Sequence, residues 1–412
     1  MIKNSLLYKF PDFRNFFVAR IISLVGDSFS AIAVSWWIVS RGTEHSKLEF
    51  GLMMATITLP RILFGPLFGV LVDRFSRKKC MLIADIARAG LAATMALLMT
   101  TGLLTIPILF VLCFLIALFA PLFEAAEGAA LMQITAPEYI ERTTALHSTA
   151  FNISNLFGLF VGASIIALLG TTVAFWLNAL SFLLSFIFVW LVKNPLSAPE
   201  RVERSPLQDF ASGLRYMYGK RPLFWLTVFF MISNLIATPL MMIIPLQVKF
   251  MFNETVFWVA AFEGAISAGA LIMGVVLARH AWKRDAYATE MSVMVGIGLI
   301  CVVLGVSYNK LFSVGLYFLL GVGIALSQTV IGALFQRAVD DEYKGRYFSL
   351  VGAIATAVMP LGFATSGFLA EALSVPQILI IFGAAHALLA FGMLALPRVD
   401  TKEKLNNEKE QL

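Results

Sequence analysis

The stretch that decides the fold runs from Gly69 to Lys79 and reads Gly-Val-Leu-Val-Asp-Arg-Phe-Ser-Arg-Lys-Lys. It follows a long apolar segment whose one charged residue is Arg61. A glycine, an acid four residues later and then a run of bases is typical of a short cytoplasmic turn between two membrane helices, because Lys and Arg concentrate in cytoplasmic loops. The stretch therefore predicts a chain that crosses a membrane.

The composition supports the same class of protein independently. Hydrophobic residues make up 59% of the chain and charged residues 14%, and the mean hydropathy is +0.85. Soluble domains carry about 25% charged residues, so an ordinary soluble protein is excluded. A membrane-spanning helix needs about 20 apolar residues, and the chain offers many such segments.

We expect an all-α membrane protein with twelve spanning helices in two pseudo-symmetric six-helix bundles. The longest polar stretch between apolar segments, 193–221, divides them into six and six, as in transporters built from repeated halves. The predicted spans are 15–40, 50–72, 80–101, 106–132, 144–169, 173–192, 223–248, 256–278, 286–306, 312–335, 347–372 and 377–396.

The distribution of Lys and Arg predicts the orientation. If the N-terminus is cytoplasmic, the internal turns hold 17 bases and the external turns hold four. The positive-inside rule then places both termini in the cytoplasm. The net charge of +6 belongs to this inner face and does not indicate a nucleic-acid partner.

The chain divides into four predicted parts: a first bundle (1–192), a linker (193–221), a second bundle (222–397) and a tail (398–412). Residues 205–218 of the linker combine a helix start signal with apolar residues at helical spacing, so we expect an amphipathic helix on the inner membrane surface. The charged tail is predicted to be disordered.

No enzymatic, metal or cofactor site is predicted. Cys80, Cys113 and Cys301 show no paired spacing and lie in or beside apolar segments. The sequence holds no nucleotide-binding loop, metal-ligand cluster or nucleophile elbow. Without a phosphate-binding loop, energy for transport is expected from an ion gradient.

The pattern Gly-x-x-x-Asp-Arg-x-x-Arg-Lys resembles the loop signature between the second and third helices of the major facilitator superfamily. Residues 13–27, 59–74 and 341–346 are similar to its branch of macrolide efflux proteins and the enterobactin exporter. The likeness implies a monomeric transporter of the bacterial inner membrane. Drug/proton antiporters of this superfamily usually carry an arginine in the fourth span, where this chain has Glu124 and Glu127 instead.

The resemblance implies a cytoplasmic gate around the opening stretch. Gly69 would allow close helix approach, and Asp73 would accept hydrogen bonds from the N-terminus of the eleventh span. Arg74 and Arg77 would pair with acids at inner helix ends, such as Asp85. Glu342 and Arg346, in the corresponding loop of the second half, are expected to form inner-face salt bridges.

Charged residues inside the spans are candidates for function, because a charge at membrane depth is costly unless it is paired or hydrated. Asp27 is expected near the membrane midplane, paired with Arg61 or with Arg20. Such a pair is either a site of coupled protonation or a permanent structural salt bridge.

Three further acids lie in spans. Glu124 and Glu127 are one helical turn apart; they either hold protons, attract a cationic substrate or partner Arg88 and Arg142. Glu263 is expected to line a cavity in the second half.

Two functions remain open at this point. The first is proton-coupled export of amphiphilic small molecules that resemble drugs or siderophores. The alternative is a lysophospholipid or other lipid flippase of the same fold. In both cases the expected partners are a small amphiphile, protons and membrane lipids.

Overall fold

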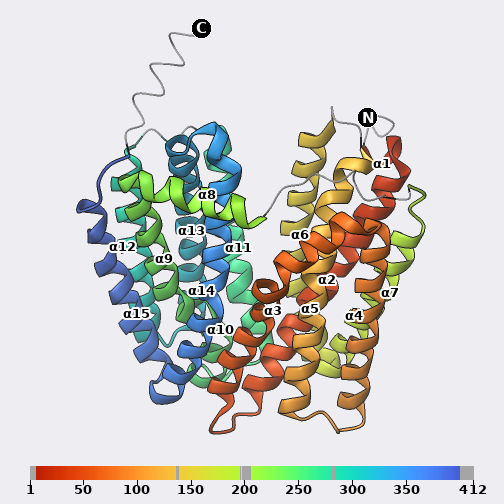
Figure 1. The fold of residues 1–412 in the computed structure, drawn as a ribbon. Helices are drawn as coiled ribbons and strands as arrows, with labels where there is room; N and C mark the ends of the chain where they lie inside the picture. The colour runs from red at the N-terminus through yellow and green to blue at the C-terminus, as the bar shows by residue number, and fades with distance from the viewer. Residues whose placement is uncertain are drawn as a thin grey trace. The chain divides into compact units, whose positions relative to one another are not determined.

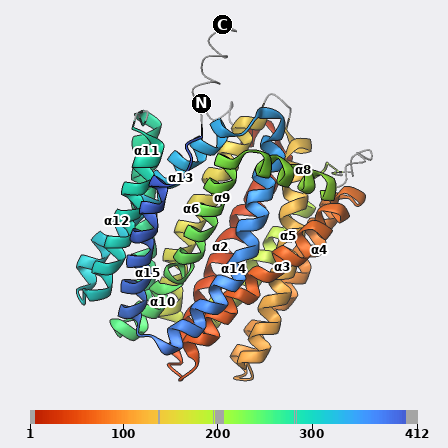
Figure 2. The ribbon, with the colours of Figure 1, turned by 60° about the vertical axis from the view of Figure 1, so that its left-hand side comes forward.

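A computed structural model describes residues 6–135, 139–194, 196, 206–280, 282 and 284–399. Its contacts divide the chain into two compact units, Met1–Glu203 with Thr255–Ala260, and Arg204–Glu254 with Ala261–Leu412. The regular elements among the described residues are helices (Figures 1 and 2). The predicted all-helical membrane fold is confirmed.

The first unit begins with a short helix and continues with six long ones. They are α1 (Leu6–Lys9), α2 (Pro11–Ser40), α3 (Ser46–Arg74), α4 (Arg77–Thr100), α5 (Ile106–Ile134), α6 (Ile140–Leu169) and α7 (Thr171–Trp190). The predicted cytoplasmic turn at Phe75 and Ser76 separates α3 from α4.

The second unit repeats six long helices and adds several short ones. They are α8 (Pro206–Gly219), α9 (Arg221–Met241), α10 (Ile243–Leu246), the π-helical turn η3 (Gln247–Met251), α11 (Val256–Arg279), α12 (Ala286–Val306), α13 (Lys310–Ala338), the 3₁₀ turn η4 (Asp341–Tyr343), α14 (Lys344–Ala372), α15 (Val375–Ala390) and the 3₁₀ turn η5 (Phe391–Leu394).

Length and composition allow 11 helices of the described residues to cross a membrane. The remaining long helix, α6, contributes the shorter apolar segment Phe157–Leu169. Large apolar side chains are exposed on the outside of the helices, with Leu67 63% and Leu361 68% exposed. This outer surface suits a lipid environment, since monomeric soluble proteins rarely expose large contiguous apolar patches.

Close helix packing occurs in both units where a glycine removes a side chain. A Cβ added to Gly26 of α2 would lie 1.9 Å from Ser181 Oγ of α7. A Cβ added to Gly298 of α12 would lie 2.4 Å from the carbonyl oxygen of Gly383 on α15. Small residues allow backbones to approach in this way in membrane helix bundles.

Helix α8 lies in the segment predicted as an amphipathic linker helix. Its Tyr216 ring stacks on Tyr343 at a centroid distance of 4.3 Å, and its hydroxyl donates to Asp340 Oδ2 at 3.0 Å. The backbone N–H of Asp340 donates to the same hydroxyl at 2.8 Å. We call this cluster, completed by Lys220, the α8 latch.

Lys220 closes the latch with an ion pair to Asp340 at 2.6 Å. Partial burial lowers the pKa of the Lys220 ammonium, and its contacts with Asp340 and Tyr216 raise that pKa more strongly, so the net shift is upward. The latch therefore joins α8 to the loop between α13 and α14. The predicted disorder of the tail concerns 398–412, of which 400–412 lie outside the described residues.

Candidate functional site

The first unit holds a half-buried ion pair between α2 and α4. Arg88 Nη2 donates to both carboxylate oxygens of Asp27 at 2.8 Å. The Arg88 side chain is 3% exposed and that of Asp27 is 36% exposed. The guanidinium also lies 3.9 Å from the centroid of the Phe182 ring on α7, a cation–π contact that supports it between the helices.

A second buried cluster joins α2, α5 and α6. Arg20 Nε lies 3.1 Å from Glu127 Oε1, and the two side chains are 9% and 6% exposed. His147 Nε2 lies 2.8 Å from the same carboxylate oxygen. One carboxylate oxygen of Glu127 thus faces both an arginine and an imidazole.

A third ion pair is more exposed. Arg61 Nη2 of α3 donates to Glu124 Oε1 of α5 at 2.5 Å, and the side chains are 56% and 38% exposed. The three acids that form these pairs, Asp27, Glu124 and Glu127, therefore each face a base from another helix.

The partners expected for Asp27 inside the first unit were wrong. Asp27 pairs with Arg88 and not with Arg20 or Arg61, which take Glu127 and Glu124 instead. The reason is that α2 and α4 both pack on α7, so that the long Arg88 side chain reaches Asp27 across Phe182.

The expected pairing at the start of α4 was also wrong. Arg77 Nη1 donates to the carbonyl oxygen of Ala129 at 2.8 Å, and Asp85 accepts a hydrogen bond from Ser185 Oγ at 2.6 Å. Asp85 is completely buried against α7, where the hydroxyl reaches it and the bases of the turn do not. The side chains of Asp73 and Arg74 are exposed. The hydrogen bond of Asp73 to the eleventh span and the pairing of Arg74 with an acid at an inner helix end stay predictions.

Two further expectations for the gate concern Gly69 and the loop before α14. A Cβ added to Gly69 would have no described atom within 4 Å, and the close helix approach expected there stays a prediction. In the loop before α14, ion pairs join Lys344 to Asp341 at 2.6 Å and Lys220 to Asp340, whereas Glu342 is exposed. Arg346 lies over the Tyr343 ring, 5.7 Å from its centroid.

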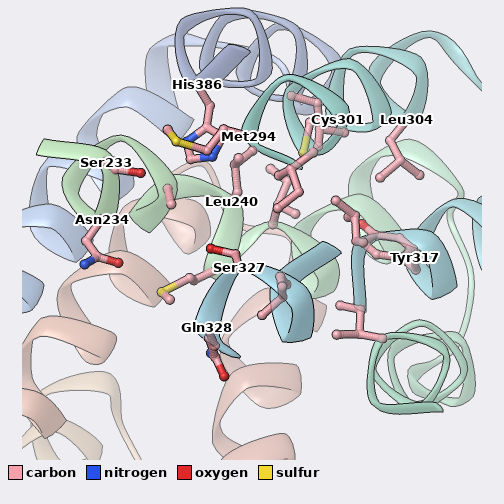
Figure 3. A pocket seen from close by; sticks show the side chains of 18 of the residues that line it. Ser233, Asn234, Leu240, Met294, Cys301, Leu304, Tyr317, Ser327, Gln328 and His386 are labelled. Atoms are coloured by element: carbon pink, nitrogen blue, oxygen red, sulfur yellow. The ribbon is translucent and has the colours of Figure 1, made fainter. Parts of the chain in front are cut away.

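The second unit contains a cavity of ≈ 390 Å³ between α9, α10, α11, α12, α13 and α15 (Figure 3). Glu263 lines it, as predicted. Apolar side chains such as Leu240, Met294 and Leu304 form much of the wall, and Ser233, Asn234 and Gln328 add polar groups.

Sequence reasoning missed two residues of this cavity, Glu290 and His386. Glu290 is 2% exposed; its Oε1 accepts a hydrogen bond from Ser327 Oγ at 2.8 Å, and its Oε2 has no hydrogen-bond partner among the described residues. His386 Nδ1 is likewise buried without a described partner. Glu290 lies one turn inside α12, so the charge itself was the signal that could have identified it.

One wall of the cavity is built around an irregular turn. Tyr317 donates a hydrogen bond to Gln247 Oε1, and Gln247 Nε2 donates to the Leu304 carbonyl oxygen at 3.4 Å. Gln247 begins the π-helical turn, and such turns are frequent at functional sites. Within the described ranges, no group of three His, Cys, Asp or Glu side chains is arranged to hold a metal ion.

Comparison with known proteins gives the family. The model of the Major Facilitator Superfamily matches residues 16–359 and 285–412. Macrolide efflux protein A of Streptococcus pyogenes is 23% identical over 96% of this chain and 97% of its own length. Multidrug efflux pump Tap of Mycolicibacterium fortuitum is 22% identical over 92% of this chain and 94% of its own length.

Solved structures agree on the fold. The nucleoside transporter NupG matches with a TM-score of 0.70 at 11% identity, covering 92% of this chain and 98% of its own. The peptide transporter POT in complex with alafosfalin matches with a TM-score of 0.70 at 12% identity over 95% of both chains. The chain therefore belongs to the Major Facilitator Superfamily, whose members are multi-pass membrane transporters and not enzymes.

Proposed function

We propose that this protein exports amphiphilic, drug- or siderophore-like molecules across the bacterial inner membrane by alternating access coupled to proton influx. The observation that carries the proposal is the Asp27–Arg88 pair, a charge pair inside the apolar part of the first unit. The efflux functions named for the relatives from Streptococcus pyogenes and Mycolicibacterium fortuitum support the direction of transport.

The geometry suits proton coupling because the two partners differ in access. Asp27 is partly exposed, so a proton can reach its carboxylate, whereas Arg88 is buried and stays charged. Protonation of Asp27 would neutralise its carboxylate and weaken the ion pair with Arg88. Helix α2 would then be held less firmly to α4. A state with Asp27 protonated and a state with Asp27 ionised would then favour different arrangements of the helices.

The other charged groups of the first unit have supporting roles in this proposal. Arg20 and Glu127 hold α2 to α5, and His147 adds a contact from α6 to the same carboxylate. Arg61 and Glu124, being more exposed, would contact substrate or water.

The gate belongs to the same proposal. Asp73 and Arg74, which are exposed at the end of α3, would form it together with Gly69 in the first half, and Arg346 would contribute in the second. We further propose that the protein works as a monomer with both termini in the cytoplasm, and that its partners are the substrate, protons and membrane lipids.

The test is substrate-dependent proton movement in proteoliposomes, with macrolides, cationic dyes, siderophores and lysolipids offered in turn. We expect one class of amphiphile to drive proton flux, and Asp27→Asn to abolish the coupled flux while the protein remains folded. Glu44→Gln, which changes an exposed acid in the loop before α3 of the same unit, is the matched control and should transport normally.

Two results would count against the proposal. Normal coupled transport by Asp27→Asn would remove the coupling site. Movement of lysolipid between leaflets without proton flux would favour the flippase function in place of export.

A further inference from the structure

The cavity of the second unit has an unusual charge distribution. Two carboxyl groups, Glu263 and Glu290, line it, and among its described lining residues there is neither a lysine nor an arginine. The sequence itself has no Lys or Arg from 222 to 248, from 250 to 278 or from 311 to 336, which cover most of the walls. Because these segments hold no base, no change in the conformation of their side chains would bring a positive charge beside the two carboxyl groups.

Two polar atoms of the cavity are also unsatisfied. Glu290 Oε2 and His386 Nδ1 are buried and have no hydrogen-bond partner in the described part of the chain. The residues themselves are 2% and 6% exposed. Glu290 therefore keeps a carboxylate oxygen that no described donor occupies, and a positively charged ligand would stabilise it electrostatically.

The chemistry of the walls limits what that ligand is. A carboxylate in an apolar site is stabilised by a positive charge far more than by a neutral group. Tyr317 and Phe230 line the same cavity, and an aromatic ring attracts a cation that lies over its negative face. The many Leu, Ile and Met side chains require that the ligand carry apolar groups.

The size of the cavity agrees with a small organic molecule. Its ≈ 390 Å³ lies within the range of about 300–1,000 Å³ that ligand pockets occupy. Ser327 holds one oxygen of Glu290 and leaves the other free, so the carboxyl group is already oriented before a ligand arrives.

We propose that this cavity binds a lipophilic organic monocation, with Glu290 and Glu263 as the counter-charges. The inference deepens the proposed function, on which it rests, by naming the substrate class of the second half. It assigns that half recognition of positive charge, whereas the first half carries the paired charges proposed for proton coupling.

The experiment measures binding of tritiated tetraphenylphosphonium to the purified full-length protein by equilibrium dialysis in detergent, with empty micelles as the blank. We expect saturable binding to the wild-type protein. Glu290→Gln and Glu263→Gln should each weaken binding at least tenfold. Glu371→Gln removes an exposed acid at the far end of α14, outside the cavity, and should bind like wild type.

A second measurement does not depend on the folding of variants. Tetraphenylborate has the same shape as the probe and the opposite charge, and it should not displace tetraphenylphosphonium from the wild-type protein. Equal displacement by the anion, absence of saturable binding to the wild type, or affinities of both carboxyl variants within twofold of wild type would each overturn the inference.

The outcomes separate this inference from the export function. Export of a neutral amphiphile with proton flux, but no binding of the cation, would leave the proposed function standing and reject the cation site. Carboxylate-dependent binding of the cation without transport in proteoliposomes would support the site and reject export.

Discussion

Three acids inside the helices of the first unit differ from two inside the second in what they face; Asp85, which bonds Ser185, stands outside this comparison. Asp27, Glu124 and Glu127 each lie against an arginine of another helix. Glu263 and Glu290 line a cavity in which no described residue is a lysine or arginine. The two units share a helical architecture, so their difference lies in charge and not in fold.

This difference separates two ways of keeping an acid in a membrane. A paired acid contributes to holding helices together, and removing one partner leaves a buried charge uncompensated. An acid without a base contributes little to stability, and its charge becomes useful when a cation arrives. Stability measurements on single variants therefore test the comparison directly.

The largest effect is expected at the Arg20–Glu127 pair. Glu127→Leu should destabilise the protein by about 3–5 kcal/mol, because it leaves the buried Arg20 guanidinium without its carboxylate. Equilibrium unfolding in mixed detergent micelles measures the change. The double variant Arg20→Met/Glu127→Leu should recover most of the loss, and a single variant as stable as wild type would contradict the pairing.

Glycine substitutions at close helix contacts should have a smaller effect, of similar size in the two units. Gly26→Ala and Gly298→Ala each place a methyl group against a neighbouring helix and should each cost about 1–3 kcal/mol in the same assay. Gly69→Ala is the control, since its Cβ would meet no described atom within 4 Å. A loss in only one unit would show that packing, as well as charge, distinguishes them.

The α8 latch contains an acid of the second unit, Asp340, that does face a base, and this acid lies outside the cavity. Tyr216→Phe removes the hydroxyl that bonds the carboxylate and the N–H of Asp340, and should cost about 1 kcal/mol. Protection of α8 from limited proteolysis should fall accordingly. Tyr218→Phe, which changes a neighbouring tyrosine that is 60% exposed, should leave protection unchanged. Equal protection in Tyr216→Phe would mean that ring stacking and the Lys220–Asp340 ion pair hold α8 without the hydroxyl.

The smallest effect is expected at Glu290. Glu290→Gln retains a side-chain oxygen for the Ser327 hydroxyl and removes a charge that has no base, so the free energy of unfolding should change by less than about 1 kcal/mol. The same unfolding assay gives the value. A loss as large as that of Glu127→Leu would reveal a hidden positive partner and erase the contrast between the units.

Much of the candidate site was accessible from the sequence because charge is conspicuous in an apolar helix. Asp27, Glu127 and Glu263 were selected on that ground. Glu290 was passed over because it stands close to the start of its helix. His386 was passed over because a single histidine in an apolar segment carries no pattern.

The pairing of these residues was not accessible in the same way. Choosing Arg88 over Arg20 as the partner of Asp27 requires knowing that α2 and α4 both pack on α7. Sequence spacing describes one helix at a time, and an ion pair between helices depends on which faces meet. The same reason explains why Asp85 bonds Ser185, a residue 100 positions away.

By itself the sequence determined the membrane class, the succession of helices and the residues able to carry charge within them. Those properties follow from local composition, since the transfer of apolar and charged groups into lipid depends on the groups themselves. The tertiary structure decided which acids pair with a base and which line a cavity without one. That distinction depends on helix packing, because a charge is paired only where another helix brings a base within about 4 Å.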